Sequence, residues 1–327
     1  MADISKENRI EHCRKLTQAR FGQVRGRPER SMLSVHDFSP ATFREIIDGG
    51  IHVKAHPEAY ETHLQGTNVA LLFQKTSTRT RCSFELGIME MGGNPIYLEW
   101  AKSNFTLADL KDEIRVLSRY AELIMARVYK HEDLVTMRTY SEVPIINGLC
   151  DRYHPCQALT DLMTVKEYFT QLDGLKLAYI GDGNNVCHSL INACSMVGID
   201  VSVAHPEGYG PDMEIVKAAQ NTIQVELTRD CATAVKNADV LYTDTWISMG
   251  QEKEKEIRLR AFGEYQINDD LLSHAPEHAI IMHCLPAHRG YEISSSAMDC
   301  PNAVVFDQAE NRKHVQKYMM AWMLDRL

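Results

Sequence analysis

The residues of this chain that are best suited to chemistry form the segment S-T-R-T-R at positions 77–81, which supplies three hydroxyl groups and two guanidinium groups. An apolar run at 69–73 precedes it and predicts a buried strand, and apolar residues at helical spacing from Phe84 to Met91 follow it. The segment is therefore expected at a helix N-terminus, where free backbone N–H groups and the helix dipole favour an anion. This pattern indicates a phosphate site, although the segment alone is also consistent with an exposed basic turn whose hydroxyls cap the helix.

A second candidate is H-P-C-Q at positions 154–157, which opens another helical pattern. His154 and Gln157 lie three residues apart and share one face of the first turn, where they can donate to a carbonyl oxygen and read an amide. The alternative is a helix cap with a hydrogen-bonded histidine. Cys150, His154 and Cys156 do not have the spacing of a structural zinc site and lack a fourth ligand, so we expect no metal.

The segment G-D-G-N-N at 181–185 follows another strand-like run. It begins like a dinucleotide-binding turn, but Val186 stands where the third glycine belongs, so the nicotinamide fingerprint is incomplete. Asn185 can instead bind a carboxylate or an amine at the end of the strand. Asn184 is suited to capping the helix that follows.

Three further residues with chemical potential lie in the last third of the chain. Asp244 begins D-T-W-I-S-M-G, with Ser248 four residues on, and this loop could bind a small ammonium group. Cys284 lies in H-C-L-P, where a buried, inert thiol is the default interpretation. Arg312 precedes a terminal apolar helix and would ordinarily be counted as a surface residue.

Strand-like and helix-like segments alternate along most of the chain. This alternation predicts a parallel α/β fold with its functional residues at the C-terminal ends of strands. The segment 171–174 is the expected crossing into a second domain. The expected strands are Val69–Phe73, Leu123–Ala126, Leu175–Ile180, Val201–Ala204, Val240–Tyr242, Ala279–Met282 and Val304–Phe306.

The composition narrows the class of protein. The chain has 327 residues, of which 44% are hydrophobic, enough for two domains with substantial cores. A formal net charge of −9 argues against nucleic acid as a partner, and no apolar stretch approaches the ~18 residues that span a bilayer. The nine cysteines are scattered without a C-x-x-C pair, which indicates reduced thiols and a cytoplasmic location.

In their order along the chain, these motifs resemble the signature blocks of the aspartate/ornithine carbamoyltransferase superfamily. The matching blocks are S-T-R-T-R, H-P-C-Q, G-D-G-N-N, D-T-W-I-S-M-G, H-C-L-P-A-H-R-G and E-N-R-K, and the resemblance covers residues 33–327. The S-M-G and H-C-L-P blocks point to ornithine rather than aspartate. The resemblance implies two parallel-sheet α/β domains, with residues 33–155 and a returning C-terminal helix at 310–327 binding carbamoyl phosphate, and residues 156–309 binding ornithine.

The resemblance also implies two sets of ligands. The set for carbamoyl phosphate is Ser77, Thr78, Arg79, Thr80, Arg127, His154, Gln157 and Arg312, and the set for ornithine is Asn185, Asp244, Ser248, Met249, Cys284 and Leu285. Arg127 and His154 are implied to stabilise the developing oxyanion, and Cys284 is implied to line the path of the reacting δ-amine. The implied reaction carbamoylates the δ-amine of L-ornithine, gives L-citrulline and phosphate in arginine metabolism, and requires no metal or cofactor.

The acceptor, the assembly and the region 99–109 are less closely defined by the motifs. Putrescine, lysine or an acylated ornithine is the alternative acceptor, although Asp244 favours a free α-amino group. The resemblance implies a homotrimer, with no nucleic acid or membrane as partner, and leaves open whether the enzyme works towards citrulline or backwards. Arg81 is expected to be structural and to pair with Glu85 one turn on. The region 99–109 departs from the family, because Trp100 and Phe105 stand in a loop that relatives contribute to a neighbouring subunit.

Overall fold

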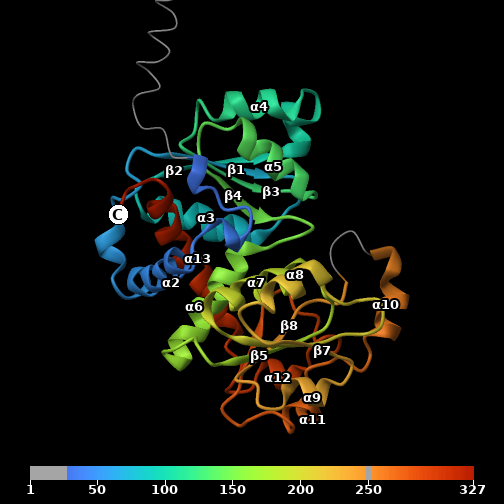
Figure 1. Ribbon diagram of the computed structural model, residues 1–327. Helices are drawn as coiled ribbons and strands as arrows, with labels where there is room; N and C mark the ends of the chain where they lie inside the picture. Colours follow the sequence, from blue (N-terminus) through green and yellow to red (C-terminus); the bar gives the residue numbers. More distant parts are fainter. Residues whose placement is uncertain (1–27, 248–251) are drawn as a thin grey trace, which may run out of the picture.

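The computed structural model describes residues 28–247 and 252–327, which form two parallel sheets with helices packed against them (Figure 1). The strand orders are β2-β1-β3-β4 in the first sheet and β7-β6-β5-β8-β9 in the second, and every pairing of these strands is parallel. The expected fold class is thereby confirmed. The strands are β1 (Asn68–Phe73), β2 (Asn94–Glu99), β3 (Leu123–Arg127), β4 (Ile145–Leu149), β5 (Lys176–Ile180), β6 (Asp200–Ala204), β7 (Val225–Thr228), β8 (Val240–Thr243) and β9 (Ile280–His283).

Central strands of parallel sheets are covered on both faces, and they therefore read as continuous apolar runs. All five residues of β3 are buried, and so are five of the six residues of β1. The strands that were not expected, β2, β4 and β7, all lie at a sheet edge, and β2 and β7 keep partly exposed residues. The expected strand at Val304–Phe306 is wrong, because this short apolar run forms the start of a long helix, with Val304 and Val305 in the core and Phe306 exposed.

Helices connect the strands and pack against the sheets. The longer ones are α2 (Pro40–Ala55), α3 (Thr78–Glu90), α4 (Leu110–Leu117), α5 (His131–Tyr140), α6 (Pro155–Phe169), α7 (Asn185–Val197) and α13 (Val305–Met323). The shorter ones are α8 (Met213–Ala219), α9 (Cys231–Val235), α10 (Lys255–Ala261), α11 (Asp269–Leu272) and α12 (Ser295–Met298). None of the helices in the described ranges has the length and apolar character needed to cross a bilayer.

The last helix returns to the first sheet, as expected. α13 leaves the second sheet after β9 and packs against α2, α3 and α6 (Figure 1). Its side chains include the fully buried Lys317, which forms an ion pair with Glu90 at the end of α3, with 3.1 Å between Nζ and Oε2. The C-terminal helix α13 is thereby held beside α3, which begins with the candidate phosphate-binding segment 77–81.

The two unexpected aromatic residues of the 99–109 region pack within their own domain. The rings of Trp100 and Phe105 lie 4.9 Å apart between centroids, and Phe105 belongs to a buried apolar cluster of the first domain that includes Leu33. These aromatic residues therefore have a structural explanation in the folding of the first domain.

Candidate active site

A cavity of about 1210 Å³ lies where the strand ends of the two sheets face each other. It is lined by the loops that follow β1, β3, β4, β5, β8 and β9, and by α10 and α13. In each sheet the strand order reverses at one place, between β1 and β3 and between β5 and β8. Ligands of parallel α/β proteins bind at such switch points, outside the carboxyl ends of the strands. The cavity therefore joins two switch points, one from each sheet.

The segment 77–81 begins α3 at the end of β1, as the sequence predicted. Ser77 is the N-cap, and its hydroxyl accepts a hydrogen bond from the backbone N–H of Thr80 at 3.4 Å. The buried Thr80 hydroxyl accepts from Nη1 of Arg127 at 3.3 Å and from Nη2 of Arg312 at 3.2 Å. Arg81 points elsewhere and pairs with Glu85 at 2.9 Å between Nε and Oε1, so its expected structural role is confirmed.

Three guanidinium groups, those of Arg79, Arg127 and Arg312, line this half of the cavity. None of the three forms a salt bridge with any carboxylate in the described ranges. Burial and the neighbouring charges of Arg312 and Arg79 lower the pKa of Arg127 from 12.5 to about 9, and its Nε atom has no hydrogen-bond partner. Uncompensated positive charge of this kind is what an anionic ligand would relieve.

His154 immediately precedes α6 and lines the same half of the cavity. Its Nε2 lies 3.3 Å from Nη1 of Arg312, which can only donate, so Nε2 accepts and Nδ1 carries the proton. His154 occupies the N-cap position of α6, as the alternative expected, but its side chain makes no capping hydrogen bond and its Nδ1 has no partner. Burial and the adjacent arginines hold the pKa of His154 well below 6.5, which leaves a neutral ring with one free N–H donor.

Gln157 lies outside the large cavity. It lines a smaller cavity of about 180 Å³ that shares Arg79, Cys284 and Arg312 with the larger one. Its Oε1 accepts from Nη1 of Arg312 at 2.7 Å. Gln157 is thus connected to the guanidinium cluster through Arg312.

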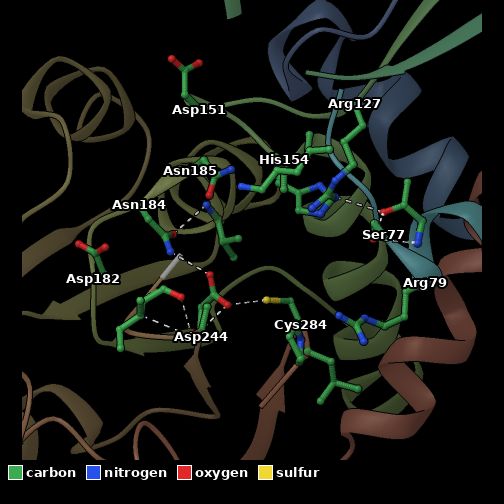
Figure 2. Close-up of a pocket in the computed structure, with 18 of the residues that line it drawn as sticks. Ser77, Arg79, Arg127, Asp151, His154, Asp182, Asn184, Asn185, Asp244 and Cys284 are labelled. Atoms are coloured by element: carbon green, nitrogen blue, oxygen red, sulfur yellow. Dashed lines mark hydrogen bonds between the residues drawn. The ribbon is translucent and has the colours of Figure 1, made fainter. Parts of the chain in front are cut away.

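The opposite half of the cavity is built around Asp244, at the end of β8 (Figure 2). This buried carboxylate accepts from Nδ2 of Asn184 at 2.8 Å, from the backbone N–H of Thr245 at 2.7 Å and from Sγ of Cys284 at 3.0 Å. No lysine or arginine in the described ranges pairs with it. The half of the cavity around Asp244 therefore offers a site for a cation.

Asn184 caps α7, as the sequence predicted, and it also holds the carboxylate of Asp244, which the sequence did not predict. Its Oδ1 accepts from the backbone N–H groups of Val186 and Cys187 at 2.9 and 3.1 Å, which confirms the expected cap of α7. Its Nδ2 holds Asp244, a contact across two loops that no local pattern signals. The neighbouring Asn185 also lines the cavity, and its Nδ2 donates to the carbonyl oxygen of Cys150 at 2.6 Å.

Cys284 follows β9 and faces Asp244 (Figure 2). Burial and the negative charge of Asp244 raise the pKa of the Cys284 thiol well above 9. The side chain is therefore a neutral S–H donor. It is suited to contacting a ligand, and it is not a thiolate nucleophile in this state.

The H-C-L-P turn is held by a buried pair that sequence reasoning missed. Nδ1 of His283 accepts the backbone N–H of Leu285 at 2.8 Å, and Nε2 of His283 lies 3.1 Å from Oε1 of Glu292, with both side chains fully buried. Because Nδ1 accepts, Nε2 carries the proton and donates to Glu292. The pair fixes the backbone at Leu285, which lines the cavity beside Cys284.

Two predicted ligands, Ser248 and Met249, lie outside the described residues. The incomplete dinucleotide turn is filled by the chain itself, because a Cβ added at Gly183 would lie 2.2 Å from the backbone nitrogen of Pro211. In the described ranges, one group of three side chains, Asp244, His283 and Cys284, has potential metal-ligand atoms within 4.8 Å of one another. All three are committed to the hydrogen bonds above, so this donor set gives no reason to revise the expectation that no metal is required.

Fold and site together define a two-domain parallel α/β protein whose cavity can hold an anionic and a cationic ligand side by side. Comparison with known families agrees. The model of the aspartate/ornithine carbamoyltransferase carbamoyl-P binding domain matches residues 30–167, and that of the aspartate/ornithine carbamoyltransferase Asp/Orn binding domain matches residues 173–323. This chain belongs to the aspartate/ornithine carbamoyltransferase family.

Individual relatives cover almost the whole chain. An ornithine carbamoyltransferase of Methanocaldococcus jannaschii is 47% identical over 289 residues, which are 86% of this chain and 95% of that protein. A Pyrococcus furiosus relative described as an anabolic ornithine carbamoyltransferase is 45% identical over 303 residues, 90% of this chain and 96% of that protein. The solved structure of ornithine carbamoyltransferase from Pyrococcus furiosus superposes with a TM-score of 0.85 and covers 89% of this chain and 96% of that chain.

Proposed function

We propose that this protein transfers the carbamoyl group of carbamoyl phosphate to the δ-amine of L-ornithine, giving L-citrulline and phosphate. The observation that carries the proposal is the pairing of opposite, uncompensated charges in one cavity: three guanidinium groups in one half and the buried carboxylate of Asp244 in the other. Carbamoyl phosphate is an anion with a reactive carbonyl group, and ornithine brings an α-ammonium group. Family membership and the names of the relatives support the same reaction.

For the donor, we assign the phosphate to the N-terminus of α3, with Ser77, Thr78, Arg79 and Thr80 as ligands. Arg127 and Arg312 complete the cationic site, and each positions a guanidinium on the Thr80 hydroxyl. The free Nδ1–H of His154 is a suitable donor to the carbamoyl oxygen. We assign Gln157 to the carbamoyl –NH₂ group.

For the acceptor, we assign the α-ammonium group to Asp244 and Ser248. Asn185 and the backbone of Met249 are assigned to the α-carboxylate. Cys284 and the carbonyl group of Leu285 are assigned to the δ-amine. Support for this half comes from the position of Asp244, Asn185 and Cys284 on one cavity and from the neutral state of the thiol.

The chemistry follows from these assignments. A δ-ammonium group has an ordinary pKa of ~10.4 and must lose a proton before its nitrogen can attack. The nitrogen then forms a bond to the carbamoyl carbon, the bond from that carbon to the bridging phosphate oxygen breaks, and the second amine proton leaves with the phosphate. Arg127, His154 and Thr80 face the negative charge that develops on the carbonyl oxygen, and each well-placed donor is worth ~3–4 kcal/mol.

The test is carbamoylation of an amine panel by the full chain. L-Ornithine, putrescine, L-lysine and N-acetylornithine are compared at equal carbamoyl phosphate, and product is measured by colorimetry or mass spectrometry. We expect L-ornithine to have the highest kcat/KM, because Asp244 requires a charged α-nitrogen. Faster turnover of putrescine or acetylornithine would reject the acceptor assignment.

The donor site has a matched pair of variants in the same segment. Arg79→Ala should abolish binding of carbamoyl phosphate in a calorimetric titration, whereas Arg81→Ala should leave it unchanged because Arg81 pairs with Glu85. Unchanged affinity in Arg79→Ala would remove the phosphate assignment.

The remaining expectations are part of the same proposal. Residues 33–155 with 310–327 form the donor domain and residues 156–309 the acceptor domain. Self-association is supported by exposed apolar side chains on α3 and β2, at Leu86, Met89 and Ile96; the homotrimer that the family resemblance implies is tested by sedimentation equilibrium. A cytoplasmic site of action is supported by the free thiols of all cysteines in the described ranges, and a role in arginine metabolism is supported by the family and its relatives.

A further inference from the structure

A carboxylate that the proposed reaction does not use lies beneath the site. Asp161, on α6, is fully buried. Its Oδ1 accepts from Nε2 of Gln157 at 2.8 Å and from Nε2 of Gln308 at 2.7 Å, and its Oδ2 accepts from the hydroxyl of Tyr242 at 3.1 Å. No cation in the described ranges forms an ion pair with it. Three neutral donors from α6, β8 and α13 thus converge on one buried acceptor.

This acceptor and Arg312 together determine which end of the Gln157 amide faces the guanidinium cluster. With the proton of the acid form on Oδ2, beside the Tyr242 hydroxyl, Oδ1 can only accept in either protonation state, so the group of Gln157 that contacts Oδ1 of Asp161 is its –NH₂. A guanidinium can only donate, so the group that contacts Arg312 must be the Gln157 oxygen. The orientation of the Gln157 amide is therefore fixed by chemistry at both ends, and its Oε1 is directed to the guanidinium cluster.

The same carboxylate orients a second amide towards the acceptor half of the site. Nε2 of Gln308 donates to Asp161, and Oε1 of Gln308 therefore accepts the backbone N–H of His283 at 2.9 Å. His283 is the last residue of β9 and directly precedes Cys284. Asp161 thus links the residue assigned to the carbamoyl group with the strand end that carries the residue assigned to the δ-amine.

We propose that Asp161 is a positioning residue for donor specificity: it holds Gln157 with Oε1 towards the carbamoyl group, so that the site selects –NH₂ over –CH₃. The inference rests on the proposed function. Oε1 has a second lone pair beside the one that Arg312 occupies, and the carbamoyl –NH₂ can donate to it. Acetyl phosphate has the same phosphate and carbonyl groups but offers a methyl group there, which leaves the second lone pair of Oε1 without a donor while Arg312 keeps the first. Such a mismatch should cost about tenfold or more in affinity.

The experiment measures calorimetric dissociation constants of the full chain for carbamoyl phosphate, acetyl phosphate and inorganic phosphate. Asp161→Leu has a similar shape but no acceptor, so it releases the –NH₂ of Gln157, and the preference for carbamoyl over acetyl phosphate should fall about tenfold. Asp161→Asn keeps an oxygen for Gln157 and can donate to the Tyr242 hydroxyl, so it should retain the preference. Tyr242→Phe, which removes a donor on the other carboxylate oxygen, is the matched control and should also retain it.

Inorganic phosphate is the control for folding. Its dissociation constant should be the same in every variant that folds and keeps the arginine cluster, so a variant that fails to bind it is not informative about donor preference and is replaced. An unchanged preference in Asp161→Leu, or an equal loss in Asp161→Asn, would overturn the inference. If Asp161→Leu does not fold, Gln157→Met serves instead, and a full preference in that variant would also overturn it. A wild-type protein that binds no carbamoyl phosphate and forms no citrulline would instead reject the proposed function.

Discussion

Replacing Arg127 by methionine should make the protein without ligand more stable and at the same time remove most of its response to phosphate. Arg127 is buried beside Arg79 and Arg312, and none of the three has a carboxylate partner in the described ranges. Its positive charge is therefore unfavourable in the empty site. Methionine fills a similar volume without a charge.

The size of the effect can be worked from the pKa of Arg127. A pKa lowered from 12.5 to about 9 corresponds to an unfavourable free energy of at most ~5 kcal/mol for the charged form in the folded protein. The lost hydrogen bond to Thr80 and screening by dissolved ions reduce the net gain to about 1–3 kcal/mol. The penalty applies wherever the guanidinium is charged in the folded state, that is below pH 9, so the gain should persist through pH 6–8. Charge-assisted hydrogen bonds contribute ~1.5–3 kcal/mol each, so phosphate affinity should fall about a hundredfold.

The assay is thermal unfolding at low ionic strength, first without phosphate and then with increasing inorganic phosphate. The wild type should be stabilised by phosphate, and Arg127→Met should begin at a Tm higher by about 3–6 °C and respond little. Arg81→Met is the control, since Arg81 is exposed, pairs with Glu85 and should keep the full phosphate response. A variant that is less stable without phosphate, or that retains the wild-type response, would refute the reasoning.

Three further changes test other parts of the site. Cys284→Ser should lower kcat and ornithine affinity about tenfold in steady-state kinetics without lowering Tm, and wild-type kinetics would reduce Cys284 to a packing residue. Glu292→Leu should lower the free energy of unfolding in urea by about 2–4 kcal/mol, because His283 and the backbone N–H of His288 lose their acceptor, whereas Glu292→Gln keeps it and should lie near wild type. Burial raises the pKa of Asp161 from 3.8 to about 7, so the free energy of unfolding of the wild type in urea should fall as pH rises from 4 to 7. Asp161→Asn cannot titrate and should lack this contribution to the pH dependence. An equal dependence of the free energy of unfolding on pH in both proteins would contradict the prediction.

The sequence was sufficient to predict those parts of the fold in which local pattern and burial coincide. β3 and β5 lie in the interior of their sheets, and their apolar runs predicted them. The edge strand β2 alternates exposed and partly buried residues, so it lacks such a run. In the run at Val304–Phe306, Val304 and Val305 enter the core whereas Phe306 is exposed, and a run of three residues does not distinguish a strand from the first turn of a helix.

The candidate site divides in the same way. Ser77, Asn185 and Asp244 were found because each follows a strand-like run, and the carboxyl ends of parallel strands meet in space. His154 was found because its motif opens a helical pattern, and Cys284 was distinguished from an inert buried thiol only by the family resemblance. Arg312 lies on α13, and only the family resemblance distinguished it from a surface arginine.

Contacts between segments far apart in the sequence account for what was missed. Asn184 contacts Asp244 across 60 residues, and Gln308 contacts Asp161 across 147. Glu292 reaches His283 from a loop with no strand of its own. No spacing rule relates such residues, because their proximity is a property of the assembled sheets.

The arginine cluster is expected to act on both substrates. A dianionic phosphate bound at the N-terminus of α3 neutralises most of the charge of Arg79, Arg127 and Arg312 but leaves positive charge beside the carbamoyl group. Positive charge near an amine disfavours its protonated form, so the δ-nitrogen of ornithine should lose its proton more readily there than in water. Asp244, which we assign to the α-nitrogen, should act in the opposite sense, because a buried carboxylate favours the ammonium form. One cavity can therefore hold two amino groups of the same molecule in different protonation states, and only the neutral one can attack.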